Sequence, residues 1–145
     1  REAALRERLE RPRPRVALGR ALAGVASACI DVSDGLLADL GHLCAASGVA
    51  ACVDVDALPG REALPAGFGT AVLRALQAAG GDDYELCFTA DAGADDVVRA
   101  AASAARTGVE VTRIGTIAAG RGLQAVDRDG RPWQPDRTGH EHFAR

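Results

Sequence analysis

Asp31-Val32-Ser33-Asp34-Gly35 joins two carboxylates and a hydroxyl to a glycine, between an apolar run and a leucine-rich run. The apolar run predicts a strand over 26–32, and the spacing of the leucines after it predicts a helix over 35–46. Such a junction places oxygen ligands beside a helix N-terminus, where carboxylates can hold Mg²⁺ and amide N–H groups can face phosphate. We therefore expect this stretch to take part in binding a nucleoside triphosphate.

Helix capping is the competing interpretation of the same stretch. Ser33 or Asp34 could accept hydrogen bonds from the first helical amides, with Gly35 easing the turn. Capping does not account for Asp31, which comes at the C-terminal end of the predicted strand. Carboxyl ends of strands face the crevice in which α/β sheets bind ligands. The residues alone thus leave a capping role and a metal role open.

The elements around this stretch predict an α/β layered domain. Further helices are expected over 1–10, 16–25, 70–79 and 94–106, and further strands over 49–55, 84–89, 109–117 and 123–127. This order favours a mixed sheet covered by helices, with parallel pairing where a helix connects two strands. The last two strands are joined by a short glycine-rich loop, which favours an antiparallel arrangement.

A second acidic motif is Gly80-Gly81-Asp82-Asp83-Tyr84-Glu85-Leu86, directly after a predicted helix. Its plain interpretation is a helix C-cap followed by an acidic turn. Three carboxylates within four residues exceed what a turn requires, and they repel one another unless water or a cation screens them. In a strand starting here, Asp83 and Glu85 would share one face, and Asp82 and Tyr84 the other. The motif is the second candidate for binding a cation.

A third acidic pair, Asp54 and Asp56, alternates with valines. This alternation is typical of a strand that has one face in water. We therefore expect both carboxylates to be solvated.

Composition and charge argue against several classes of protein. The chain has 145 residues, the size of one domain, and 48% of them are hydrophobic. Its net charge of −3 argues against a nucleic-acid-binding surface. We find no segment typical of a membrane span, no signal peptide, no P-loop and no glycine-rich Rossmann fingerprint.

The cysteine pattern predicts a reducing compartment. The four cysteines lack the spacing of metal ligands, and most lie in apolar runs: Cys29, Cys44, Cys52 and Cys87. They are predicted to be buried free thiols. Because structural disulfides are rare in the cytosol, we expect a cytoplasmic protein.

The chain contains no methionine, so it cannot begin at its own start codon. It opens on a charged helix that starts abruptly and is followed by a proline-rich segment. We expect residues 1–15 to be a helix and linker from a missing N-terminal domain, and residues 16–145 to form the domain itself.

Taken in order, the motifs resemble the C-terminal half of the thiamine-monophosphate kinase family, in the superfamily of aminoimidazole ribonucleotide synthetase. The matching segments are 13–19, 28–40, 53–59, 80–89, 112–115 and the closing His142-Phe143. No single segment is decisive, but the ordered set is specific and covers nearly the whole chain. The resemblance implies the synthetase C-terminal-domain fold and ATP-dependent phosphorylation of thiamine monophosphate to thiamine diphosphate. It also implies a homodimer for the full-length protein.

Carried over by position, the resemblance implies that Asp31 and Asp34 are Mg²⁺ ligands and that Ser33 contacts ATP. It implies substrate contacts for Asp82 and Phe143, although family members often carry Glu where Asp82 stands. No catalytic acid or base is implied, because the attacking phosphate oxygen is already anionic at neutral pH. The implied ligands are Mg²⁺, ATP as a substrate, and thiamine monophosphate.

Two other functions stay open at this point. One is another ATP-dependent synthetase of the same superfamily, and the other is a non-catalytic nucleotide-binding domain. The acidic motif over 80–86 and the tail favour the thiamine enzyme. We expect residues 1–145 alone to bind nucleotide weakly and not to turn over.

Overall fold

The structure is a computed structural model that describes residues 2–61 and 68–135. Its helices are α1 (Glu2–Glu10), α2 (Val16–Ala21), α3 (Leu36–Ser47), α4 (Thr70–Ala79) and α5 (Asp95–Ala104). Its strands are β1 (Ala26–Asp31), β2 (Val49–Asp54), β3 (Leu86–Ala90), β4 (Gly115–Ala119), β5 (Gly122–Val126) and β6 (Pro132–Trp133). The predicted α/β fold with a mixed sheet and covering helices is confirmed.

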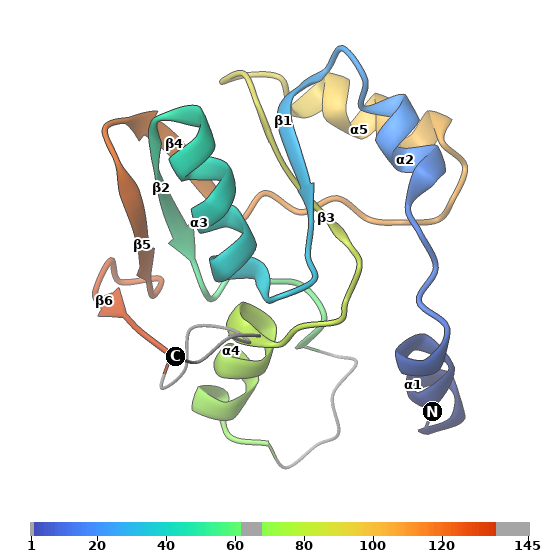
Figure 1. The fold of residues 1–145 in the computed structure, drawn as a ribbon, viewed down its shortest axis with the longest axis horizontal. Helices are drawn as coiled ribbons and strands as arrows, with labels where there is room; N and C mark the ends of the chain where they lie inside the picture. The colour runs from blue at the N-terminus through green and yellow to red at the C-terminus, as the bar shows by residue number, and fades with distance from the viewer. Residues whose placement is uncertain (1, 62–67, 136–145) are drawn as a thin grey trace.

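Helix α3 is the centre of the fold and covers the larger sheet (Figure 1). It contacts β1, β2, β5 and α4, and it buries Leu37, Leu40 and Leu43 of the predicted leucine stripe. The helix ends at Ser47 and is followed by the capping residue Gly48, whose φ of 67° is the left-handed conformation that glycine adopts without strain. The hydrophobic core therefore lies between α3 and the strands, along the length of this helix.

The larger sheet has four strands in the order β4-β2-β5-β6. Strand β2 pairs with β4 antiparallel and with β5 parallel. The last two predicted strands, β4 and β5, therefore run in opposite directions as expected, but β2 lies between them. Ala50 of β2 pairs with Ala118 on one side and Gly122 on the other, so the link at Gly120 passes the start of β2.

Strands β1 and β3 form a separate antiparallel ribbon. Its last pair joins Asp31 at the end of β1 to Leu86 at the start of β3. The strand predicted over 84–89 is present as β3 but begins at Leu86, because Tyr84 has a φ of 51°, which a strand does not allow. Asp82 has a φ of 64°, so the face-sharing expected for a strand that starts in the acidic motif is wrong. The ribbon thus brings the ends of both acidic motifs together.

Two other predicted elements are shorter in the structure than expected. The helix predicted over 16–25 ends at Ala21, and the strand predicted over 109–117 begins at Gly115. The second difference follows from pairing, because Gly115 is opposite Val53 and β2 itself ends one residue later. Among the described helices, none combines the length and the apolar character needed to cross a membrane.

The four cysteines are free thiols, but they are not all buried. Cys44 and Cys87 are buried, Cys52 is half-buried and Cys29 is exposed. Cys29 differs because the β1–β3 ribbon has two faces, and Ile30 takes the position on the core side. The prediction of buried thiols is therefore wrong for Cys29.

Candidate functional site

The two acidic motifs lie side by side and are joined through their backbones. The Val32 amide donates to the carbonyl of Glu85, and the Tyr84 amide donates to the carbonyl of Val32, both at 2.8 Å. The Asp82 amide donates to the carbonyl of Ser33, also at 2.8 Å. These bonds continue the β1–β3 pairing past the last ladder residues, so segments about fifty positions apart form one structural unit.

Two glycines allow this close approach. A Cβ atom at Gly35 would lie 2.9 Å from the carbonyl oxygen of Ala79, at the end of α4. A Cβ atom at Gly81 would lie 2.7 Å from the carbonyl oxygen of Ser33. Gly35 also has a φ of 123°, which side-chain-bearing residues rarely adopt. Glycine is therefore required both where the first motif meets the end of α4 and where the two motifs meet.

The loop before α3 is held from inside by Asp39. The amides of Ser33, Asp34 and Gly35 donate to its Oδ2 atom at 2.9, 3.0 and 3.2 Å. The predicted orientation of loop amides toward phosphate is therefore wrong for these three groups. Capping by Ser33 or Asp34 is also not what the structure shows, since the N-cap position belongs to Gly35.

Negative charge gathers where the motifs meet. The hydroxyl of Tyr84 donates to Asp82 Oδ1 at 3.3 Å. The charge of Asp82 is the largest cause of a raised pKa for Tyr84, and Asp31 and Asp34 add to the rise. Asp31 and Asp82 are exposed and Asp34 is half-buried. Three predicted site residues are thus brought into one electrostatic environment.

Positive φ angles at Asp82 and Tyr84 mark strained backbone at this junction. A bulky residue in the left-handed region costs free energy and persists where the surroundings hold it in place. Here the two residues are held by hydrogen bonds from their backbone amides to the carbonyls of Ser33 and Val32. The arrangement gives the Asp82 carboxylate and the Tyr84 hydroxyl a defined position beside the loop.

The donor set fits a hard cation with oxygen ligands, the class to which Mg²⁺ belongs. Within residues 2–61 and 68–135, no group of three or more His, Cys, Asp or Glu side chains is arranged to hold a metal ion. Mg²⁺ is usually held by one or two carboxylates, with water and substrate phosphates completing its shell. Asp31 and Asp34 suit that partial role, because both carry carboxylate oxygens close to the start of α3.

Glu85, by contrast, is already paired with arginines. Arg15 binds it through Nε and Nη2 at 2.8 and 2.5 Å, and Arg8 of α1 binds it at 2.5 Å. The hydrogen bond to Arg15 is the main cause of the lowered pKa of Glu85. The pKa of Asp83 is raised instead, mainly by desolvation. In the second motif, Glu85 therefore serves a structural role through its hydrogen bonds to arginine, and Asp82 and Asp83 have no such bond among the described residues.

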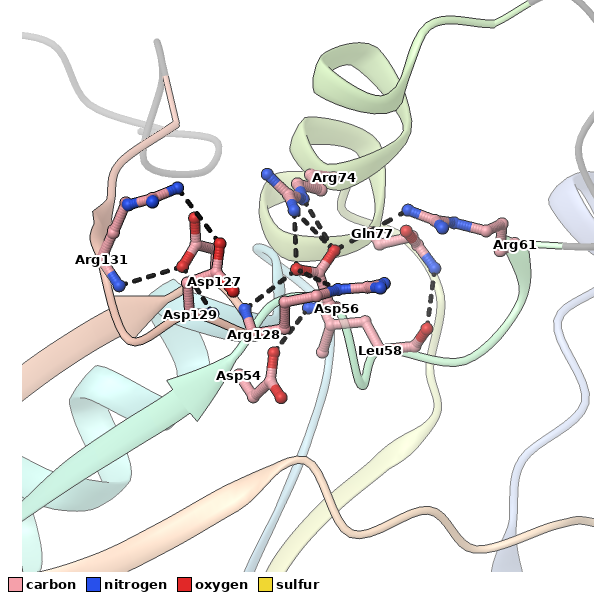
Figure 2. Close-up of polar contacts among 10 residues, drawn as sticks. All are labelled: Asp54, Asp56, Leu58, Arg61, Arg74, Gln77, Asp127, Arg128, Asp129 and Arg131. Atoms are coloured by element: carbon pink, nitrogen blue, oxygen red, sulfur yellow. Dashed lines mark hydrogen bonds and ion pairs between the residues drawn. The ribbon is translucent and has the colours of Figure 1, made fainter.

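Asp56 lies at the centre of a separate cluster of arginines (Figure 2). Arg74 of α4 reaches both carboxylate oxygens at 2.6 Å, and the Arg128 amide donates at 3.0 Å. Arg61 lies at 3.9 Å. The hydrogen bonds from Arg74 are the main cause that lowers the pKa of Asp56 to about 2, and the bond from the Arg128 amide adds to the effect. Its side chain is only 5% exposed, so the prediction of a solvated carboxylate is wrong for Asp56.

The structure therefore gathers Asp31, Ser33, Asp34 and Asp82 at one place, whereas Phe143 lies outside the described residues. Asp39 is the residue that the motif analysis overlooked. A signal was available, because Asp39 sits next to Leu40 on a helix whose other buried positions are apolar. An acid flanked by an apolar stripe indicates a buried polar contact.

The family model described as AIR synthase related protein, C-terminal domain, matches residues 3–128. The thiamine-monophosphate kinase of Salmonella typhimurium is 48% identical over 92% of this chain, and that of Caulobacter vibrioides is 40% identical over 97%. The chain spans about 41% and 40% of the length of these two relatives. The predicted resemblance to this family is confirmed.

Solved structures agree with the sequence comparison. The thiamine-monophosphate kinase from Stenotrophomonas maltophilia is 50% identical, with a TM-score of 0.78 over 88% of this chain and 39% of that one. A structure described as AaThiL complexed with AMPPCP and TMP is 27% identical, with a TM-score of 0.70 over 98% of this chain and 42% of that one. The chain therefore belongs to the AIR synthase related proteins, as their C-terminal domain.

Proposed function

We propose that this chain is the C-terminal part of an ATP-dependent kinase that converts thiamine monophosphate to thiamine diphosphate. The observation that carries the proposal is the junction of the two acidic motifs, which brings Asp31, Asp34 and Asp82 together around Tyr84. The relatives named thiamine-monophosphate kinase support the reaction class. The neighbour complexed with AMPPCP and TMP supports the substrate pair, since AMPPCP is an ATP analogue.

The reaction requires little acid or base chemistry. A phosphate oxygen of thiamine monophosphate attacks the γ-phosphorus of ATP, a new P–O–P bond forms, and ADP leaves with the electrons of the broken bond. The barrier comes from bringing two polyanions together, so positioning and charge neutralisation are the tasks of the protein. Carboxylates repel phosphates, so a carboxylate cluster would assist this reaction only through bound cations.

In this proposal Asp31 and Asp34 hold Mg²⁺, and the Ser33 hydroxyl donates to a phosphate oxygen of ATP. Bound Mg²⁺ supplies the positive charge that offsets repulsion between the two substrates. Asp82, held by the hydrogen bond from its backbone amide to the Ser33 carbonyl, contacts the thiamine substrate. In this proposal Phe143 packs against the same substrate.

The rest of the assembly is proposed on the same grounds. The chain spans about 41% of the Salmonella relative and matches a family model described as a C-terminal domain. We propose that an N-terminal portion completes the metal site and forms the homodimer. The boundary near residue 15 stays a prediction, and Arg8 and Arg15 both bind Glu85 in the domain body. The cytoplasmic location also stays a prediction.

The proposal is tested in the full-length protein that contains this chain, with Asp31→Asn as the variant. Each protein is incubated with Mg-ATP and thiamine monophosphate, and thiamine diphosphate is followed by chromatography. We expect product from the parent and a loss of about 100-fold in kcat for the variant, as for removal of a metal contact. Asp96→Asn is the matched control, because Asp96 is an exposed acid on α5.

Two results would count against the proposal in different ways. Absence of thiamine diphosphate from the parent would reject the reaction. Equal product from the parent and Asp31→Asn would keep the kinase but reject the metal role of Asp31. The control Asp96→Asn is expected to match the parent, so a loss there would show that any removed charge lowers activity.

A further inference from the structure

We propose that Asp39 is a positioning residue that gives the Asp31–Gly35 loop its preference for cations. It turns the loop amides inward, so that the loop presents side-chain oxygens rather than N–H groups to a ligand. This inference rests on the proposed function and deepens it, since it concerns how the same site selects between a cation and a bare phosphate.

The hydrogen bonds define the orientation of the loop. One carboxylate oxygen, Oδ2 of Asp39, accepts from the successive amides of Ser33, Asp34 and Gly35 at 2.9 to 3.2 Å. Three successive amides pointing to one atom form a concave anion site, and here its occupant is a side chain of the same protein. A phosphate group therefore cannot use these amides while Asp39 is in place.

The position of Asp39 makes this role specific. It lies in the first turn of α3, where an acidic side chain is favoured by the helix dipole. The residue is only 4% exposed, so water does not compete for its carboxylate. The α3 helix is anchored in the core through Leu40 and Leu43, which fixes the carboxylate relative to the loop.

The charge of Asp39 is not cancelled by an ion pair within residues 2–61 and 68–135. Its three hydrogen bonds come from uncharged amides, which stabilise the carboxylate but do not cancel its negative charge. The same charge contributes to the raised pKa of Cys87, about 11, for which burial is the main cause. Asp39 therefore adds negative potential at the loop that carries Asp34, and such potential attracts cations and repels free phosphate.

The variant that tests this inference is Asp39→Asn in the full-length protein. Asparagine keeps an acceptor oxygen of the same shape but removes the charge. Three quantities are measured: Mn²⁺ binding without substrate, ADP binding in EDTA, and hydrogen exchange of the peptide that contains Ser33 to Gly35. We expect Mn²⁺ affinity to fall about tenfold, as for other residues that support metal ligands. Affinity for metal-free ADP should stay equal or rise, and exchange in the loop should become faster.

Two control variants separate positioning from general loss of structure. Val53→Ala truncates a core side chain that is 1% exposed and removes no polar group. Asp96→Asn removes one exposed charge outside the loop. Neither is expected to change the ratio of Mn²⁺ to ADP affinity, whereas Asp39→Asn is expected to change it by about tenfold.

The opposite pattern would overturn the inference. If Asp39→Asn weakened Mn²⁺ and metal-free ADP by the same factor, Asp39 would serve only the fold. If Mn²⁺ affinity stayed at the level of Asp96→Asn, the charge of Asp39 would have no role in cation binding. Neither binding measurement depends on turnover, so a parent that makes no thiamine diphosphate would reject the proposed reaction and leave this test intact.

Discussion

Asp39 and Asp56 are two carboxylates that solvent hardly reaches, and the protein binds them in opposite ways. Asp39 accepts from three neutral amides of the loop before α3. Asp56 is bound by the guanidinium of Arg74 and by the amide of Arg128, with Arg61 nearby. The first arrangement preserves a negative charge, and the second neutralises it. Burial alone therefore does not show whether an acidic residue serves the fold or the site.

The two regions also connect different parts of the chain. The Asp56 cluster ties the end of β2 to α4 and to the turn after β5 (Figure 2). The Asp39 contacts tie α3 to the loop that precedes it. Helix α4 links both regions, because Arg74 binds Asp56 and Ala79 at its end packs against Gly35. Helix α4 therefore contacts both regions.

The largest effect on stability is expected from Asp56→Ala. The change leaves Arg74 and the Arg128 amide without their acceptor in a poorly solvated position, and breaking a buried ion pair is strongly destabilising. We expect the urea midpoint to fall by on the order of 1 M, measured by circular dichroism. A midpoint equal to that of the parent would mean that the arginine cluster contributes nothing to folding.

The next largest effect is expected from Gly35→Ala, which breaks the close approach of α4 to the loop. The new methyl group would meet the carbonyl of Ala79, and alanine does not tolerate a φ of 123°. We expect a loss of about 2 kcal/mol in the free energy of unfolding, measured by urea titration.

Gly41→Ala is the matched control for this prediction. Gly41 lies within α3 and has no atom within 4 Å of the added methyl group. The same substitution should therefore stabilise the protein by about 0.5 to 1 kcal/mol. If both variants changed stability in the same direction, the strain assigned to Gly35 would be wrong.

The smallest effect is expected in the acid dependence of stability. The pKa of Asp56 is about 2 in the folded protein, below its ordinary value of 3.8. Its contribution is therefore complete above about pH 4 and is lost as the pH falls toward 2. Asp56→Asn should flatten the curve of urea midpoint against pH in this window and leave its shape above pH 5 unchanged. The lowered pKa of Glu85 acts in both proteins and cancels in the comparison.

Much of the architecture follows from the chain's own patterns. The leucine stripe of α3, its end at Gly48 and the alternation of helices and strands were all predictable, because periodicity and glycine placement are local signals. Pairing was less predictable. That β2 lies between β4 and β5 depends on contacts between distant segments, which a short glycine-rich loop does not specify.

The candidate site shows the same division. By itself, the sequence determined which residues carry oxygen ligands, because Asp31, Ser33, Asp34 and Asp82 stand in two recognisable acidic motifs. Tertiary structure alone decided how these groups are used. It turned the loop amides toward Asp39, paired Glu85 with arginines and enclosed Asp56 among other arginines. For Glu85 and Asp56 the physical reason is that charge neutralisation depends on arginines that other elements supply. For Asp39 the partners are near in the chain, and what the folded structure decided is the direction in which the loop amides point, which the identity of a ligand group does not specify.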